Sequence, residues 1–280
     1  LRGANSRNDR ENDLCNKAPI CRGRARRSSP TVPQSNYAKV GCMNKHEMES
    51  TLKRALSLQQ ENKLDEAKKL FDDLLKQEPN NPDALHGIGL LFAQKKDYQE
   101  AARWMEQAVM VAPEVPGFHN NLGNVYKALF KPNDAIRHYQ QALRLKTPYP
   151  EVRNNLGSLY FQQGMIDEAI EQLQKAVREA PERVDAHFNL SMCYIQKDRL
   201  LDAATHLKQT LRLRPDHLGA LHNLGMTLVA LKNFEEAKPL LLKVIEREPA
   251  NVDALFHLGV IEASLGSLEE AQRLYEQVLK

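Results

Sequence analysis

The sequence predicts an all-α fold, a right-handed superhelical solenoid of stacked helix-turn-helix units, because three residue types recur with one period. Alanine recurs every 34 residues without interruption, at Ala67, Ala101, Ala135, Ala169, Ala203, Ala237 and Ala271. Glycine recurs at the same interval, at Gly89, Gly123, Gly157, Gly225 and Gly259, with Ser191 in the remaining slot. Proline follows the same spacing at Pro79, Pro113, Pro181, Pro215 and Pro249. A fixed period of this length indicates stacked supersecondary units.

These repeats divide most of the chain into seven units. The units start at residues 48, 82, 116, 150, 184, 218 and 252, and the last is truncated at Lys280. Residues 1–47 carry ten Lys and Arg against four acidic residues, a net charge of 10 − 4 = +6. This basic tail has no apolar period, so we expect it to be disordered. Its Arg22–Arg27 run suggests a localisation or nucleic-acid patch, and a plain hypothesis makes Met43 the natural first residue.

The residues of each unit have physical reasons for their places. In the first helix, the glycine, alanine or serine position marks where the second helix comes too close for a larger side chain. The recurring alanine is the matching small site on the second helix. Bulky residues such as Leu122, Tyr126 and Tyr139 fill the apolar stripe beside them. Between the helices, residues suited to a left-handed backbone stand at one offset: Asn62, Gly164, Asp198 and Gly266.

Prolines and caps mark where helices end and begin. The recurring proline ends the second helix, and the run Asn81–Asp83 supplies a cap, a first-turn proline and an acid for the next helix. Unit three departs from this pattern, because the run Phe130–Pro132 occupies its inter-helix turn. We expect that proline to shift the start of the second helix of unit three.

Composition argues against several classes of protein. No stretch approaches the roughly 18 apolar residues of a transmembrane helix, so we expect no membrane partner and a cytoplasmic location. Residues 48–280 carry a net charge of +3 − 6 = −3, which disfavours nucleic-acid binding. Cys15, Cys21, Cys42 and Cys193 show neither a disulfide framework nor zinc-ligand spacing. Cys193 lies on an apolar helix, where a packed small residue is favoured over a nucleophile.

The sequence offers no catalytic residues, no cofactor motif and no metal site. His222 and His257, with Asp253 nearby, come nearest to a metal cluster, but no His-x-x-x-His pair supports one. The glycines occur singly at helix-packing positions, so a phosphate-binding loop is absent from the pattern. We therefore expect this chain to bind a partner rather than to catalyse a reaction.

The repeat resembles a known motif. In unit four, Asn155–Gly157 is followed by Tyr160, Gly164, Ala169, Ala176 and Pro181. These positions resemble the tetratricopeptide repeat, and the likeness extends over residues 48–280. It implies helix pairs whose first helices line a concave surface that binds other proteins.

One polar residue recurs on the first helices. The sixth position of four successive units holds Asn121, Asn155, Asn189 and Asn223. An amide side chain carries two donors and an acceptor oxygen, so a row of amides can pair with the backbone of an extended peptide. Neighbours expected beside the same groove are Asn120, Asn124, Asn154, His222 and His257. The alternative is that these asparagines bond between adjacent helices, and the two roles can coexist.

This asparagine row, with the run Asn121–Lys127, is similar to the repeat region of O-linked N-acetylglucosamine transferases. The resemblance implies that the row holds extended protein segments by their backbone. We therefore expect a scaffold or adaptor that binds an extended peptide in its concave groove. An alternative is the substrate-recruiting region of a larger enzyme, a glycosyltransferase or methyltransferase whose catalytic domain lies outside this chain. A third is self-association through uncapped solenoid ends.

Acidic residues form a second row. The second position of five units holds Glu49, Asp83, Glu151, Asp185 and Asp253. Acids in a first turn complement the helix dipole, and the alternative is an acidic edge of the groove. Since no cation stands at this position, the carboxylate clamp of chaperone-binding tetratricopeptide domains is not expected.

Overall fold

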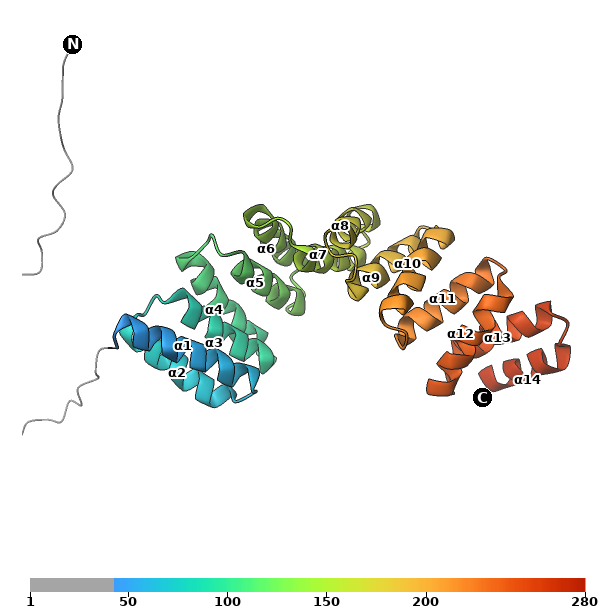
Figure 1. The fold of residues 1–280 in the computed structure, drawn as a ribbon, viewed down its shortest axis with the longest axis horizontal. Coiled ribbons are helices and arrows are strands. Elements are labelled where there is room, and N and C mark those ends of the chain that lie inside the picture. Colours follow the sequence, from blue (N-terminus) through green and yellow to red (C-terminus); the bar gives the residue numbers. More distant parts are fainter. Residues whose placement is uncertain (1–42, 280) are drawn as a thin grey trace, which may run out of the picture. The chain divides into compact units, whose positions relative to one another are not determined.

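The computed structural model describes residues 43–279, and all regular elements within that range are α-helices (Figure 1). They are α1 (Lys45–Gln60), α2 (Leu64–Gln77), α3 (Pro82–Gln94), α4 (Tyr98–Val111), α5 (Pro116–Ala128), α6 (Pro132–Leu145), α7 (Pro150–Gln162), α8 (Ile166–Glu179), α9 (Val184–Gln196), α10 (Leu200–Leu213), α11 (Leu218–Ala230), α12 (Phe234–Arg247), α13 (Val252–Ser264) and α14 (Leu268–Val278). The predicted all-α solenoid is confirmed. The expectations for residues 1–42 lie outside the described residues.

The helix starts keep the 34-residue period along the chain. From α3 onward, the first helices begin at residues 82, 116, 150, 184, 218 and 252, where the units were expected to start. The second helices begin at residues 64, 98, 132, 166, 200, 234 and 268. The expected shift in unit three is therefore wrong. Proline is well suited to the first position of a helix, where its fixed φ matches and no amide hydrogen is needed, so Pro132 starts α6 in register.

The first unit begins earlier than the repeat pattern indicates. Helix α1 starts at Lys45, within the range assigned to the tail. Asn44 and Glu47 form a reciprocal capping box, in which each side chain accepts a hydrogen bond from the other residue's backbone N–H at 2.9 Å. A capping box satisfies two of the unpaired N–H groups at a helix start. Local capping therefore extends α1 beyond the periodic apolar pattern.

Close approach of the two helices explains the small residues within each unit. A Cβ atom added to Gly123 would lie 2.7 Å from the ring of Tyr139, and one added to Gly157 would lie 2.6 Å from Leu173. The recurring alanine of the second helix is also buried, with Ala135 fully inaccessible. The glycine position thus leaves room for a side chain of the second helix, and the alanine position is buried, as the repeat pattern predicted.

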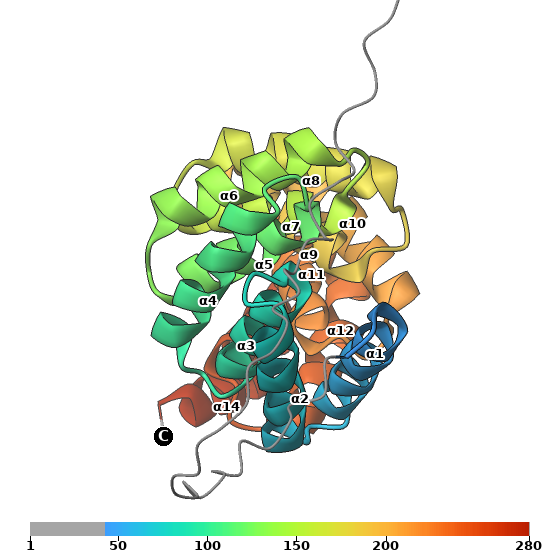
Figure 2. The same cartoon turned by 90° about the vertical axis from the view of Figure 1, so that its left-hand side faces the viewer.

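Helix pairs stack through both kinds of helix. Each second helix packs on the first helix of the next unit, and first helices also contact one another: α1 with α3, α3 with α5, α5 with α7, α7 with α9, and α11 with α13. Figure 2 shows α5, α7, α9 and α11 inside the arc of α4, α6, α8 and α10. The first helices therefore line the inner surface, as the repeat pattern implied.

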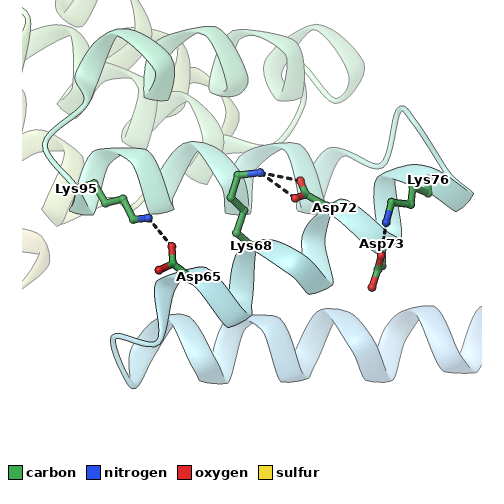
Figure 3. Close-up of polar contacts among 6 residues, drawn as sticks. All are labelled: Asp65, Lys68, Asp72, Asp73, Lys76 and Lys95. Carbon is green, nitrogen blue, oxygen red and sulfur yellow. Dashed lines mark hydrogen bonds and ion pairs between the residues drawn. The ribbon is translucent and has the colours of Figure 1, made fainter.

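Ion pairs link the end of one first helix to the second helix of the unit before it. The Nζ of Lys95 lies 2.7 Å from a carboxylate oxygen of Asp65, as Figure 3 shows. The Lys68–Asp72 and Lys76–Asp73 pairs in the same view lie within α2. Lys197 and Asp167 repeat the Lys95–Asp65 contact at 2.8 Å three units later. At these two places the inter-helix turn thus lies beside the start of the preceding second helix.

The inter-helix turns all contain one residue in the left-handed region. Asn62, Gly164, Asp198 and Gly266 have φ of 60°, 75°, 56° and 87°, which confirms the expected left-handed backbone. Lys96, Phe130 and Lys232 adopt it as well, with φ of 62°, 56° and 59°. Non-glycine side chains are disfavoured there by roughly 1–2 kcal/mol because Cβ approaches the next carbonyl. The same left-handed turn thus recurs in every unit, even where the residue at that position disfavours it.

We expect Lys232→Gly to stabilise the protein by about 1 kcal/mol, because glycine reaches positive φ without the Cβ penalty. The urea midpoint of unfolding, followed by circular dichroism, measures the change. Lys243→Gly in the interior of α12 is the matched control, and it should destabilise by about 1 kcal/mol. Equal destabilisation by both changes would show that the left-handed turn carries no strain.

Candidate functional site

The predicted asparagine row lies on the inner helices. Asn121, Asn155, Asn189 and Asn223 belong to α5, α7, α9 and α11, and each is half-buried. Their neighbours at the preceding position, Asn120 and Asn154, are buried, with 3% and 8% of their surface exposed. In units three and four the row therefore presents one partly accessible amide next to a buried one.

The amide nitrogens of the row bond back to the preceding unit. Asn155 Nδ2 lies 3.3 Å from Oδ1 of Asn120, and Asn189 Nδ2 lies 3.0 Å from Oδ1 of Asn154. Between units two and three, a histidine takes the place of the receiving asparagine, and Asn121 Nδ2 lies 3.0 Å from Nε2 of His86. The alternative role weighed for the row, bonding between helices, is thus present in the structure. These bonds use the Nδ2 atoms of Asn155 and Asn189 and leave their Oδ1 atoms out of the contact.

A carboxylate sets the direction of these bonds in unit three. Asn120 Nδ2 donates to Glu151 at 3.2 Å, and an ionised carboxylate accepts only. The Oδ1 of Asn120 is therefore the atom turned toward Asn155, which has to present its Nδ2. Asn155 Nδ2 also lies 3.2 Å from Oδ1 of Asn124, which accepts from the Tyr139 hydroxyl at 2.6 Å. Glu151 was expected only to complement a helix dipole or to edge the groove, and this orienting contact was missed.

The fourth member of the row differs from the others. Phe188 replaces the asparagine or histidine that would receive the Asn223 amide, and Nδ2 of Asn223 lies 3.1 Å from the sulfur of Met192 instead. Sulfur is a weak acceptor, so Asn223 is held less firmly than Asn155 or Asn189. The sequence pattern treated the four residues alike, because the side chain that receives each amide lies in another unit.

Two histidines of the inner helices, His86 and His257, have a lowered pKa. Burial lowers the pKa of His86 to about 4, and its ring stacks on Phe118 with centroids 4.4 Å apart. Burial also lowers the pKa of His257. His222 Nε2 and His257 Nδ1 are buried without a hydrogen-bond partner among residues 43–279. The row thus combines amides with imidazoles such as His86, next to the Glu151 carboxylate.

Two histidine pairs, which the repeat pattern did not reveal, join the first and second helices of units three and five. The Nδ1 atoms of His119 and His138 lie 3.0 Å apart, and those of His187 and His206 lie 2.9 Å apart. His119 Nε2 lies 2.9 Å from the Pro113 carbonyl, which can only accept. A neutral His119 therefore accepts at Nδ1, and His138 donates. A signal for this pairing is that both histidines recur after two repeat periods.

Acid should weaken the fold through these pairs. Burial, followed by His119 and Arg137, lowers the pKa of His138 to about 4, while Asp134 acts in the opposite direction. Burial also lowers the pKa of His206. Since an unfolded histidine has a pKa of about 6.5, the unfolded chain binds more protons as pH falls from about 6.5 toward 4. The free energy of unfolding should fall through that window.

The double variant His138→Gln, His206→Gln keeps a hydrogen-bond donor on each second helix but cannot titrate. We expect its urea midpoint to fall less than that of the wild type between pH 7.5 and pH 5. His46→Gln, at an exposed position of α1, is the control, and its urea midpoint should change with pH as that of the wild type does. Parallel pH profiles for all three proteins would contradict a role of the pairs in acid sensitivity.

Two further features concern reactive groups, the Cys193 thiol and the metal-ligating side chains of residues 43–279. Cys193 is fully buried, and burial raises the pKa of its thiol to about 12, which agrees with a packed residue. Among residues 43–279, no cluster of three or more His, Cys, Asp or Glu side chains is placed to hold a metal ion. Nor does any helix of that range combine the length and apolar character needed to cross a membrane.

Comparison with known proteins identifies the repeat. A family model described as tetratricopeptide repeat matches residues 52–117, 155–217 and 222–280, and a second of that description matches residues 127–182 and 194–249. The chain belongs to the tetratricopeptide-repeat family. It is a repeat scaffold for protein interaction. No curated protein matches the chain.

Solved structures share the tetratricopeptide-repeat fold. YrrB, described as a repeat protein with an unusual peptide-binding site, is 28% identical, with 64% of this chain and 92% of YrrB covered and a TM-score of 0.54. PilF of Pseudomonas aeruginosa is 21% identical, with coverages of 70% and 90% and a TM-score of 0.62. A repeat protein of Cytophaga hutchinsonii is 18% identical in its C-terminal part, with coverages of 81% and 94% and a TM-score of 0.66. The last two show the fold alone.

Proposed function

We propose that this scaffold holds an extended peptide segment of a partner protein against the inner helices, through the oxygens of the asparagine row. The observation that carries the proposal is the direction of the amides. The Nδ2 atoms of Asn155, Asn189 and Asn223 contact the preceding unit, so their Oδ1 atoms are left for a ligand. Oδ1 of Asn121 already accepts from Nδ2 of Asn120 at 3.4 Å, so the proposal rests on the other three residues. No donor among residues 43–279 bonds to Oδ1 of Asn155, Asn189 or Asn223.

A row of acceptors favours backbone recognition. Each residue of an extended peptide other than proline carries one N–H, whatever its side chain. The lowered pKa values of His86 and His257 keep these two imidazoles uncharged near pH 7, so they add no positive charge beside the row. Binding of this kind depends on an extended conformation more than on sequence.

The comparisons support the proposal in part. The peptide-binding site named in the description of YrrB belongs to that protein, and this chain resembles it at 28% identity. The likeness to O-linked N-acetylglucosamine transferases rests on the asparagine row and the run Asn121–Lys127. Both likenesses favour a peptide ligand. The orientation of the amides points to the asparagine oxygens as the atoms that accept hydrogen bonds from this ligand.

One inter-unit bond allows a matched pair of variants. Asn189→Ala and Asn154→Ala each delete the 3.0 Å Asn189–Asn154 bond, so both should reduce stability by roughly 0.5–1.5 kcal/mol. Only Asn189 offers its oxygen to the groove, since Asn154 is buried. We expect Asn189→Ala to weaken peptide binding roughly 2- to 10-fold and Asn154→Ala to change it less than about 2-fold.

The probe is a fluorescein-labelled ten-residue peptide, selected from a random display library on the wild-type protein and measured by fluorescence anisotropy. N-methylation of single peptide bonds in this probe should weaken binding at positions that face the row. Alanine substitution of its side chains should matter less. Equal losses for the two protein variants, or insensitivity to every N-methyl group, would contradict recognition through the asparagine oxygens.

A further inference from the structure

The turn between α5 and α6 carries an aromatic side chain that the fold does not use. Phe130 is 93% exposed, the most exposed large apolar side chain among residues 43–279. Its backbone has φ of 56°, a region that bulky residues rarely adopt. Single exposed apolar residues are common on protein surfaces, but few of them also occupy a disfavoured backbone conformation.

The turn is built by its backbone alone. Phe130 N–H donates to the Lys127 carbonyl at 3.1 Å, and Lys131 N–H donates to the Tyr126 carbonyl at 2.9 Å. The turn around Gly164 makes the same two bonds at 3.0 and 2.9 Å with no side chain at that position. The ring of Phe130 therefore contributes nothing that glycine, asparagine or aspartate does not supply in equivalent turns.

The surroundings of Phe130 are positively charged. Lys127 and Lys131 flank it, and neither forms an ion pair with a carboxylate in residues 43–279. Lys131 Nζ lies 5.9 Å from the centre of the Tyr126 ring, and the nearby Asp134 pairs with Arg137 at 2.7 Å. By contrast, Lys95 and Lys197, at the ends of α3 and α9, are both paired with aspartates. Two lysines without an ion pair among residues 43–279 thus lie within three residues of Phe130 in the chain, on a scaffold whose repeats are net acidic.

We propose that Phe130, with Lys127 and Lys131, forms a second docking surface for an acidic amphipathic helix of a partner protein. The apolar side of such a helix covers the ring, and its carboxylates pair with the two lysines. Exposed aromatic residues that become buried in a complex commonly contribute much of its binding energy. This surface lies on the turn between the helices and does not involve the asparagine row, so it stands independently of the proposed peptide groove.

Fluorine NMR can test the surface directly, with 4-fluorophenylalanine placed at position 130. The probe is a synthetic amphipathic helix made of leucine and glutamate, and a leucine–lysine helix of the same pattern is its control. We expect a saturable shift of the fluorine signal with the acidic helix alone. Charge reversal by Lys127→Glu and Lys131→Glu together should weaken that binding at least roughly tenfold.

The variant Phe130→Gly separates docking from folding. We expect it to raise the urea midpoint, because glycine removes the strained conformation, while its affinity for the acidic helix, measured by calorimetry, falls at least roughly tenfold. Unchanged affinity in Phe130→Gly, or no saturable shift with the acidic helix, would overturn the proposal. A shift that depends only on the concentration of the protein itself, or that appears only with phosphatidylserine vesicles, would replace it with self-association or membrane contact.

Discussion

The close contact between the two helices of each unit is the constraint on which the rest of the structure depends. Gly123 and Gly157 allow Tyr139 and Leu173 to approach within a distance that excludes a Cβ atom. The same contact recurs at Gly89, Gly225 and Gly259, and Ala55 and Ser191 keep the position small in the other two units. Every inter-helix turn contains one residue in the left-handed region. Even Phe130 and Lys232 accept that conformation, which shows that packing between the helices prevails over local backbone preference.

Stacking of identical pairs then places equivalent residues of neighbouring units side by side. The inner helices contact one another. A polar residue at position six of one unit, such as Asn155, can therefore bond to the residue at position five of the preceding unit, Asn120. In this way the nitrogen of Asn155 or Asn189 bonds to the scaffold, and its oxygen accepts no bond from another residue of 43–279. The inter-helix role is therefore present, and the proposed role in peptide binding would use a different atom of the same amide.

Much of the fold was predictable because it depends on short-range, repeated patterns. The small residues, the cap at Asn81 and the left-handed Gly164 each act within a few residues of their own position. The prediction for Pro132 was wrong because it weighed the proline as a helix breaker and not as a favoured first residue. The early start of α1 was missed because a capping box, rather than apolar periodicity, determines it.

The sequence by itself determined the all-α repeat, the position of its helices and the row of asparagines on the inner helices. All three follow from the 34-residue period. Only the tertiary structure decided which way each amide points, that Asn223 meets a sulfur instead of an amide oxygen, and that His119 bonds to His138. These contacts join different helices, and their partners differ from unit to unit. Their geometry follows from how neighbouring helices stack, which a single repeat does not encode.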